Sequence, residues 1–539
     1  MRPRANRHVS LSRREFLRVS GQAELGALAL TLGGALPLQA QKFELPKGKV
    51  DPSKLPPGVI HLTVKEVTWE LAPGKVIQGY AYGDLNRGYI PGPVIRAKEG
   101  EMVRILLDND LLDLATAVHW HGIDEVPTAT RAAEAIPDDP VGSGDKYLYE
   151  FKATPSGTRW YHPTHLVSTA GDKIGTKQED LGLAGALIVD PAGPEPFPFD
   201  REYILVFDTW TTGTSRPLPQ TWDGTAVAGV RGGMAAMMSS MGGISPGMRM
   251  MGGSPGTMMG SMVRGRLTPS WDTTSINGKA YPATEPLKVR KGERVRLRFI
   301  NASNTFTHVI RLAGHPLQVT HTDGNPLLEP VAVDAVPIAV AERYDVLFTA
   351  DRPGAWFLYC TQPGHAAAGE MALVVYDGYE GAPAAPPVPG TAGLRVWQYA
   401  LGRGRDIDKL VPPATGQVRD FQLVLTGNPM LSDVWMINGR VEPWTERLDV
   451  RKGDLVRVAL TNMSPWDHPF HLHGQSYKVV AVNGYRLPIP LVKDTVDVHP
   501  HMGTVFLEFT AQFVADWPFH CHIYPHSDGG MFTEVRIRD

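Results

Sequence analysis

The chain has 539 residues, with 53 Lys and Arg against 56 Asp and Glu. This length exceeds what one hydrophobic core usually organises and predicts two to four domains, while the near balance of charge and the lack of a long basic run argue against a nucleic-acid partner. The 56 Gly and 46 Pro favour a turn-rich β protein, and two cysteines far apart, Cys360 and Cys521, do not form a disulfide framework.

The first forty residues have the layout of an export signal. Residues 12–18 read SRREFLR, and an apolar run of small residues follows over 25–38. Paired arginines before such a run are typical of a twin-arginine signal, and the run is too short for a membrane span. We therefore expect residues 1–40 to be a twin-arginine export signal, processed near Ala40, and the mature protein to be periplasmic or otherwise exported, with no membrane span.

One strand pattern occurs three times: VIRAKEGEMVRILLDN, LKVRKGERVRLRFIN and LDVRKGDLVRVALTN, at residues 94–109, 287–301 and 448–462. Each copy predicts a short strand, a charged turn at a glycine, and an alternating strand that ends at Asn. In the second copy three apolar residues alternate with three arginines, the pattern of a half-buried strand: Val295, Leu297 and Phe299 with Arg294, Arg296 and Arg298. The second and third copies each follow an Ile-Asn-Gly turn, at 276–278 and 437–439.

Repetition at a spacing of roughly 160 to 190 residues indicates three related domains. We place them at 52–192, 198–378 and 395–539, with the Pro/Ala/Gly-rich stretch 380–393 as the linker before the third. Long helical periodicity is absent, so each domain is predicted to be an antiparallel β-sandwich and the whole fold to be all-β.

Ten of the 18 histidines fall into four short clusters: HWHG at 119–122, WYHPTH at 160–165, HPFHLHG at 468–474 and HCHIYPH at 520–526. Residues two apart on a strand point to the same side, so His520 and His522 can face one metal site while Cys521 faces another. A thiolate, His526, another histidine and the distant thioether of Met531 form the ligand set of a blue-copper centre. A single His-x-His pair is more often a surface or satisfied pair, but the four clusters together indicate copper.

A methionine-rich segment lies within the second predicted domain. Residues 234–262 contain ten of the 18 methionines among Gly, Ser and Pro, which predicts a loop rather than a core helix. Thioether sulfur is a soft ligand suited to Cu(I). The segment is therefore expected to bind additional Cu(I); the alternative is an insert with no metal role.

The second domain also contains a partial copy of the residue spacing in the last cluster. Cys360 is followed by His365 and Met371, as Cys521 is followed by His526 and Met531, and His308 stands where a partner histidine would. The pattern fits a second or vestigial blue-copper site. The interpretation that we favour from sequence alone is a buried strand cysteine with chance neighbours.

Taken together, these motifs resemble those of the multicopper oxidases, in particular the bacterial laccase and cuprous-oxidase group. The similarity covers the whole mature chain, and the first, third and fourth histidine clusters are its most specific part. The resemblance implies three cupredoxin-like (Greek-key) β-sandwich domains and four copper ions: one type 1, one type 2 and two type 3. The trinuclear cluster would lie between the first and third domains.

The resemblance also implies which residues bind each copper. The type 1 ligands would be Cys521, His468 and His526, with Met531 as the weak axial ligand, and the type 2 ligands His119 and His471. The type 3 pair would have six: His121, His162, His165, His473, His520 and His522. Electrons would enter at the exposed edge of His526 and pass from Cys521 to His520 and His522, the residues expected to be catalytic.

Two features depart from the family pattern. His162 and His165 are three residues apart where the family has His-x-His, so we expect a one-residue bulge after Pro163 that returns His165 to the site; otherwise one type 3 ligand is lost. The acids that assist proton delivery are also displaced. Thr130 and Ser527 stand at usual acidic positions, and Asp124, Glu125 or Asp528 are the candidate replacements.

The sequence leaves three functions open. The first is a cuprous oxidase and laccase-like enzyme that passes electrons from Cu(I) or small phenols to dioxygen and protects the cell envelope from copper. The second is a broad phenol or bilirubin oxidase with an incidental methionine-rich loop. The third is a copper-free scaffold or cell-division relative, which the retained ligand residues disfavour. Three strand units disfavour a two-domain nitrite reductase, and a monomer is expected.

Overall fold

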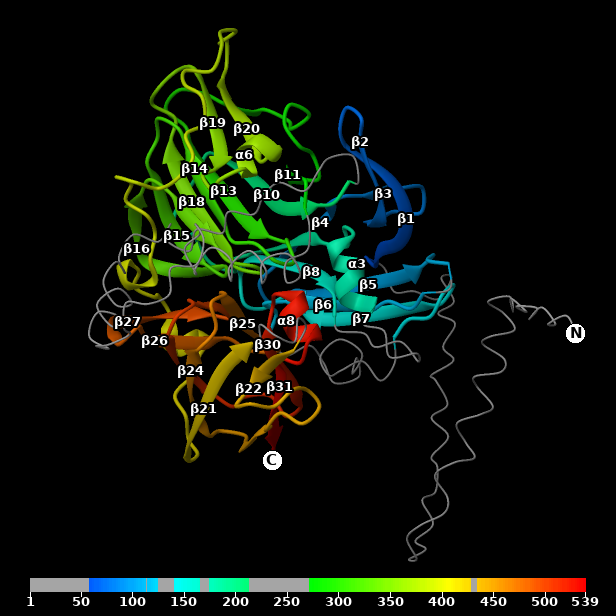
Figure 1. The fold of residues 1–539 in the computed structure, drawn as a ribbon, viewed down its shortest axis with the longest axis vertical. Coiled ribbons are helices and arrows are strands. Elements are labelled where there is room, and N and C mark those ends of the chain that lie inside the picture. Colours follow the sequence, from blue (N-terminus) through cyan, green and yellow to red (C-terminus); the bar gives the residue numbers. More distant parts are fainter. Residues whose placement is uncertain (1–57, 113, 125–139, 165–173, 213–270, 428–433) are drawn as a thin grey trace, which may run out of the picture. The chain divides into compact units, whose positions relative to one another are not determined.

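The computed structural model describes residues 58–112, 114–124, 140–164, 174–212, 271–427 and 434–539 (Figure 1). These residues form six β-sheets paired into three sandwiches, which confirms the all-β cupredoxin-like fold. The predicted export signal, Glu125, His165 and the methionine-rich segment lie outside the described residues. In the part that is described, no helix is both long and apolar enough to cross a membrane.

The first sandwich packs a five-stranded sheet, β3-β2-β1-β5-β7, against a four-stranded sheet, β4-β9-β8-β6. Its strands are β1 Ile60–Ala72, β2 Lys75–Gly83, β3 Gly88–Tyr89, β4 Gly92–Lys98, β5 Met102–Asn109, β6 Val118–His121, β7 Lys146–Lys152, β8 Gly157–Pro163 and β9 Gly185–Asp190, with helix α3 at Ile174–Asp180. Leu107 and Trp120 are buried between the two sheets. The first histidine cluster therefore lies on β6, and His162 of the second lies on the neighbouring strand β8.

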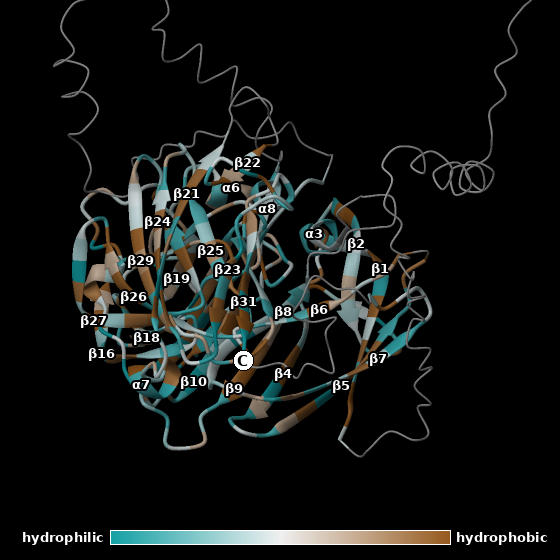
Figure 2. Cartoon of the chain, turned by 90° about the horizontal axis from the view of Figure 1, so that it is seen from below, coloured by the Kyte–Doolittle hydropathy of each residue, from teal (hydrophilic) through white to brown (hydrophobic). Residues whose placement is uncertain are grey.

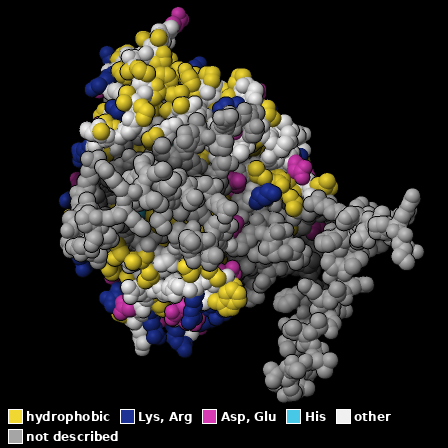
Figure 3. All heavy atoms as spheres, in the orientation of Figure 1, with side chains coloured by type: hydrophobic (Ala, Val, Ile, Leu, Met, Phe, Trp, Pro, Cys, Tyr) yellow, Lys and Arg dark blue, Asp and Glu magenta, His cyan; other side chains and the backbone are white. Residues whose placement is uncertain are grey.

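The second sandwich has the sheets β11-β10-β13-β18-β15-β16 and β12-β20-β19-β14-β17. Its elements are β10 Arg201–Trp210, β11 Thr273–Ile276, β12 Leu287–Val289, β13 Arg294–Asn301, β14 His308–Leu312, β15 Leu317–Thr322, β16 Asn325–Val333, β17 Val336–Ile338, β18 Arg343–Thr349, β19 Ala355–Cys360, α6 His365–Ala368 and β20 Met371–Tyr376. Figure 3 shows hydrophobic side chains gathered on one face of this sandwich, near β19 and β20.

The third sandwich repeats this arrangement strand by strand, with the sheets β22-β21-β24-β29-β26-β27 and β23-β31-β30-β25-β28. After η3 Tyr399–Leu401 and α7 Ile407–Leu410, its elements are β21 Val418–Gly427, β22 Trp435–Ile437, β23 Leu448–Arg451, β24 Leu455–Asn462, β25 His468–Leu472, β26 Tyr477–Val482, β27 Tyr485–Lys493, β28 Thr495–Val498, β29 Gly503–Thr510, β30 Asp516–Cys521, α8 Tyr524–Asp528 and β31 Phe532–Arg538. The second and third sandwiches thus place equivalent strands at equivalent positions.

The repeated strand unit forms the same structure in all three sandwiches. Each short strand lies in one sheet (β4, β12, β23) and the alternating strand that follows lies in the opposite sheet (β5, β13, β24). Both Ile-Asn-Gly segments form tight turns, with positive φ at Asn277 and Gly278 and again at Asn438 and Gly439, because Asn and Gly tolerate the left-handed region. Figure 2 shows the alternation of hydrophobic and hydrophilic residues along the strands.

The arginine face of β13 differs from the sequence prediction. Val295, Leu297 and Phe299 enter the core as predicted, but Arg296 and Arg298 are buried as well. Arg298 contacts Asp345 at 2.9 Å and Thr158 of the first sandwich at 2.9 Å. The prediction of a half-buried strand was therefore wrong on this face, because the first sandwich covers it and buried cations require such partners.

Candidate metal centres

Three side chains of the third sandwich converge in its core. His468 opens β25, Cys521 closes β30, and His526 lies in α8. The Sγ atom of Cys521 lies 3.6 Å from Nδ1 of His468 and 3.5 Å from Nδ1 of His526, and the two nitrogens are 3.0 Å apart. All three side chains are buried. Met531 is buried in the same core; its backbone N–H donates to the carbonyl of His526 and its carbonyl accepts from the N–H of Cys521.

Neighbouring groups hold these imidazoles in place. The Oγ of Ser464 lies 2.8 Å from Nε2 of His468, which leaves Nδ1 turned toward the cysteine. The ring of Trp435 lies 3.6 Å from that of His526, centroid to centroid. His526 is only 4% exposed. The expected exposed edge is therefore wrong, because Trp435 packs against this ring.

The electrostatics of the cluster formed by His468, Cys521 and His526 suit a bound cation. Burial raises the pKa of Cys521 well above its usual value and lowers the pKa of His468 to about 3. An uncompensated thiolate is disfavoured in such a place, whereas a metal ion would stabilise it. The donor set of two imidazoles, one thiol and a nearby thioether fits copper better than zinc.

Seven further histidines form a second cluster between the first and third sandwiches. They are His119 and His121 of β6, His162 of β8, His471 of β25, His473 just after it, His520 of β30, and His522. Nε2 of His119 and Nε2 of His471 are 3.2 Å apart, as are Nδ1 of His121 and Nε2 of His162. Nε2 of His473 lies 3.1 Å from Nε2 of His520, and all seven side chains are buried.

The cluster of seven histidines has the character of a metal site. Burial is the main reason that the pKa values of His121, His162, His471 and His522 are lowered well below the usual range. Neither ring nitrogen of His522 reaches a hydrogen-bond partner in another described residue. Neutral, buried imidazoles with unused nitrogens are poor structural elements but suitable ligands.

The two clusters are joined by three consecutive residues. In the register of β25 and β30, Phe470 is opposite Cys521 and His471 is opposite His520. Cys521 therefore points into the core of the third sandwich, whereas His520 points to the other face, toward His473. The ring of His522 lies 5.0 Å from that of His162 of the first sandwich.

The structure describes only some of the other residues that the sequence predicts beside the seven-histidine cluster. β8 ends at Pro163 with regular pairing to β6, and the expected bulge and His165 fall beyond the described residues. Of the candidate acids, Asp528 accepts a hydrogen bond from Thr176 at 2.8 Å, while the backbone N–H of Asp124 donates to Thr154.

Sequence reasoning missed Glu179 on α3. Its carboxylate lies 2.5 Å from Nδ1 of His162 and is fully buried. Burial, together with Asp208 and Asp180, raises the pKa of Glu179 well above its usual value. The sequence offers little signal for it, because the short helix that carries Glu179 contains another acid and no histidine.

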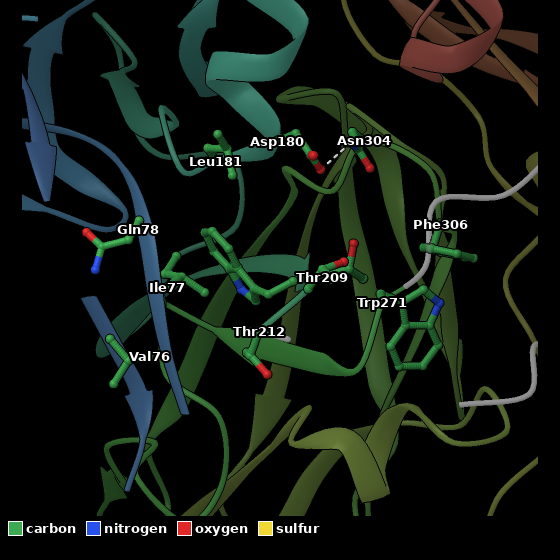
Figure 4. Close-up of a pocket in the computed structure, with 12 residues that line it drawn as sticks. Val76, Ile77, Gln78, Asp180, Leu181, Thr209, Thr212, Trp271, Asn304 and Phe306 are labelled. Carbon is green, nitrogen blue, oxygen red and sulfur yellow. Dashed lines mark hydrogen bonds between the residues drawn. The ribbon is translucent and has the colours of Figure 1, made fainter. Parts of the chain in front are cut away.

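A pocket of about 250 Å³ lies where the first and second sandwiches meet (Figure 4). Ile77, Asp180, Trp271 and Asn304 line it, and the side chain of Asn304 donates a hydrogen bond to Asp180. Thr212 also lines it. Thr212 and Trp271 are the last and first described residues on either side of the methionine-rich segment, so the chain leaves and re-enters the described structure here.

Comparisons with known proteins agree with this geometry. Three segments, 79–193, 252–378 and 418–539, match models of a family described as Multicopper oxidase. The chain is 31% identical over 467 residues to multicopper oxidase MmcO of Mycobacterium tuberculosis, covering 86% of this chain and 84% of that relative. It is 26% identical over 666 residues to copper resistance protein A of Escherichia coli, covering 98% of this chain and all of that relative.

Solved structures show the same fold. The multi-copper oxidase from Pseudomonas Thermotolerans matches with a TM-score of 0.62 at 21% identity, covering 89% of this chain and 99% of that chain. The laccase from Botrytis aclada matches with a TM-score of 0.64 at 20% identity, covering 88% and 87%. The three family-model matches and the 31% identical relative show that the chain belongs to the multicopper oxidase family, and is a copper-binding oxidoreductase.

Proposed function

We propose that this multicopper oxidase couples the one-electron oxidation of Cu(I) and small phenols to the four-electron reduction of dioxygen to water, and that it contributes to copper tolerance. The observation that carries the proposal is the sequence His520-Cys521-His522. Its cysteine belongs to one candidate metal cluster and its two histidines belong to the other. The main chain of these three residues is a covalent path between the two clusters.

The proposed metal ligands follow from this arrangement. His468, Cys521 and His526, with Met531, would bind one copper as the type 1 site. His119 and His471 would bind the type 2 copper, and the type 3 pair would be bound by His121, His162, His165, His473, His520 and His522. Copper supplies the redox chemistry when bound. The chain fixes the imidazoles and keeps them neutral by burial.

Cu(I) as a substrate is supported by soft donors near the cluster of His468, Cys521 and His526. Met463 and Met502 are 51% and 62% exposed, and the N–H of Met502 donates to the carbonyl of Asn462, next to Met463. Asp467 and Asp497 stand beside His499 in the same region. The exposed thioethers suit the capture of a cuprous ion from solvent. The methionines of 234–262 would add further Cu(I) sites.

A broad phenol or bilirubin oxidase is the second candidate, since relatives named laccase are 25% and 28% identical to the chain. In that case the methionine-rich segment would be incidental. The names of the copper resistance relatives favour the first candidate. We further propose that the chain is exported by the twin-arginine pathway and acts as a monomer.

The test is dioxygen uptake by the copper-loaded chain, with Cu(I) and with a bulky phenol as separate substrates. We expect four Cu(I) oxidised per dioxygen and no released peroxide. Deletion of 234–262 should lower the rate with Cu(I) and raise the rate with the phenol. Parallel changes with both substrates would show that the segment is structural, and release of peroxide would contradict four-electron reduction.

A further inference from the structure

The second sandwich contains a third convergent cluster that the proposed oxidase reaction does not use. His308, Cys360, His365 and Glu370 bring one ligand atom each to within 4.8 Å of one another. All four side chains are buried, with exposures between 0% and 4%. Cys360 is a buried strand cysteine, as the favoured interpretation of the sequence has it, and β14, β19 and α6 also bring its histidine neighbours close in space.

The cluster occupies the place that the type 1 candidate occupies in the third sandwich. His308 opens β14 as His468 opens β25, and Cys360 closes β19 as Cys521 closes β30. The Sγ of Cys360 lies 3.5 Å from Nδ1 of His365, the same distance that separates Cys521 from His526. The two sandwiches thus present the same cysteine–histidine arrangement.

The groups that orient the first histidine are also duplicated. The Oγ of Ser303 lies 3.2 Å from Nε2 of His308, as that of Ser464 does at 2.8 Å from His468. Ser303 is held by Asn301, and Ser464 by Asn462, through matching hydrogen bonds. A partner on Nε2 leaves Nδ1 turned toward the cysteine, the orientation that a metal ligand requires.

One position distinguishes the two clusters. The sequence suggested Met371 as the counterpart of Met531, but the main chain assigns that place to Glu370. The N–H of Glu370 donates to the carbonyl of His365, and its carbonyl accepts from Cys360, as Met531 pairs with His526 and Cys521. Met371 lies one residue later and is partly exposed. A carboxylate therefore stands where the third sandwich has a thioether.

The carboxylate of Glu370 is directed at the same point as the imidazoles. Its Oε2 lies 3.0 Å from Nδ1 of His365. Its Oε1 lies 2.7 Å from Nδ1 of His308, yet these two atoms do not meet the geometry of a hydrogen bond, with each other or with another described residue. Close contact without alignment is what two ligands of one ion show. A buried carboxylate charge is costly unless it is balanced, and a metal ion at this point would balance it.

We propose that His308, Cys360, His365 and Glu370 form a second metal centre that binds one divalent d-block cation, Zn²⁺ or Cu²⁺. The thiolate and carboxylate would supply two negative charges, which match a divalent ion, and the oxygen donor is harder than a thioether and disfavours Cu(I). Four protein ligands with no open position are typical of a structural site. Metal binding would therefore stabilise the second sandwich.

The test uses the fact that the chain has only two cysteines. In the full-length Cys521→Ser variant, any thiolate-to-metal charge-transfer band must come from Cys360. We expect the metal-free variant to develop such a near-ultraviolet band with about one equivalent of Co²⁺ as the probe. Zn²⁺ should bleach the band, and Cu²⁺ should replace it with its own. The metal content of the Cys521→Ser variant as purified then identifies the native ion.

Two further variants on the same background complete the experiment. Cys360→Ser should abolish the band, and Glu370→Met should weaken retention of Zn²⁺ at least tenfold while keeping a Cu²⁺–thiolate band. Native mass spectrometry of the otherwise unmodified chain should show one metal ion fewer after Glu370→Ala. Absence of a thiolate band with all three metals in Cys521→Ser, or an unchanged metal count in Glu370→Ala, would overturn the proposal in favour of a metal-free hydrogen-bonded cluster.

Discussion

His162 shows how one side chain can be set by two different neighbours. Its Nε2 lies 3.2 Å from His121 within the histidine cluster, and its Nδ1 lies 2.5 Å from the carboxylate of Glu179. A carboxylate behind a ligating imidazole fixes its orientation and increases its basicity. Glu179 would thereby support metal binding without touching the metal.

Glu179→Gln keeps the shape of this side chain and replaces its ionisable carboxyl group with an amide. We expect a loss of roughly 10- to 100-fold in copper retention or in dioxygen uptake, with Glu179→Ala at least as severe. Copper remaining after dialysis against a chelator measures the effect. The control is Asp180→Asn, one residue further on α3, whose side chain contacts Asn304 instead. Equal losses in both variants would indicate general damage to α3.

His165 remains a prediction, since it lies outside the described residues. If the chain bulges after Pro163, His165 completes the six imidazoles of the type 3 pair. His165→Ala should then deplete type 3 copper and stop dioxygen reduction, while type 1 copper remains blue. Electron paramagnetic resonance with copper analysis would distinguish these outcomes, and full copper with full turnover would show that His165 is not a ligand.

At the residue scale, alternation along the strands predicted the directions of side chains, but the sequence could not predict tertiary contacts. The opposite directions of Cys521 and His520 follow from a period of two, and both could be placed from sequence. The burial of His526 under Trp435 could not be predicted, because the two residues are 91 positions apart. Glu370 was missed for a finer reason: matching Met371 to Met531 by residue type shifted the comparison by one position.

Asp180 is the last residue of α3 and lies where the first and second sandwiches meet. Its titration should make the free energy of unfolding depend on pH. Burial raises its pKa to about 6, although the hydrogen bond from Asn304 and the charge of Lys177 act in the opposite direction. A carboxyl whose folded pKa is raised favours folding when protonated. Its stabilising contribution is present below its unfolded pKa near 4 and is lost as the pH rises through about 6.

Asp180→Asn should remove this dependence. At pH 8 the variant should be more stable than the unmodified chain by about 1 to 2 kcal/mol, a value reduced because the side chain is partly exposed. Near pH 4 the two should be alike. Thermal unfolding at both pH values measures the difference, with Asp377→Asn at an exposed ion pair as the control. A shift that is the same at both pH values would contradict the assigned pKa.

At the scale of elements, local sequence predicted the strand units and their turns, and the Asn-Gly pairs adopted the positive φ that the turns require. The burial of the arginine face of β13 could not be predicted from the sequence. Arg296 and Arg298 have the alternation of a solvent-facing strand, and only the position of Glu195, Glu202 and Asp345 shows that this face is buried.

The three sandwiches meet at one buried ion pair. Arg343 of the second donates to both oxygens of Asp494, between β27 and β28 of the third, at 2.7 and 2.5 Å. His121 of the first places Nε2 3.1 Å from the same carboxylate. Burial alone would raise the pKa of Asp494, but the charge and hydrogen bonds of Arg343 outweigh it and hold that pKa below its usual value.

Arg343→Met should therefore destabilise the whole described unit, because it leaves a buried carboxylate without its main partner. The expected cost at neutral pH is about 3 to 5 kcal/mol. A depressed pKa contributes stability above the unfolded pKa near 4 and loses it as the pH falls. In the variant, burial would instead raise the pKa of Asp494, so protonation at pH 5 should relieve part of the cost.

Thermal unfolding of Arg343→Met at pH 7.5 and pH 5 tests this argument, and copper retention provides a second measurement. Arg201→Met is the matched control, since Arg201 forms a more exposed pair with Glu293 and should cost less than about 1 kcal/mol. Because Asp494 also contacts His121, the Arg343 variant should lose copper from the histidine cluster more readily than the control. A destabilisation that grows toward pH 5, or equal effects of the two substitutions, would contradict the role assigned to this ion pair in joining the sandwiches around the cluster.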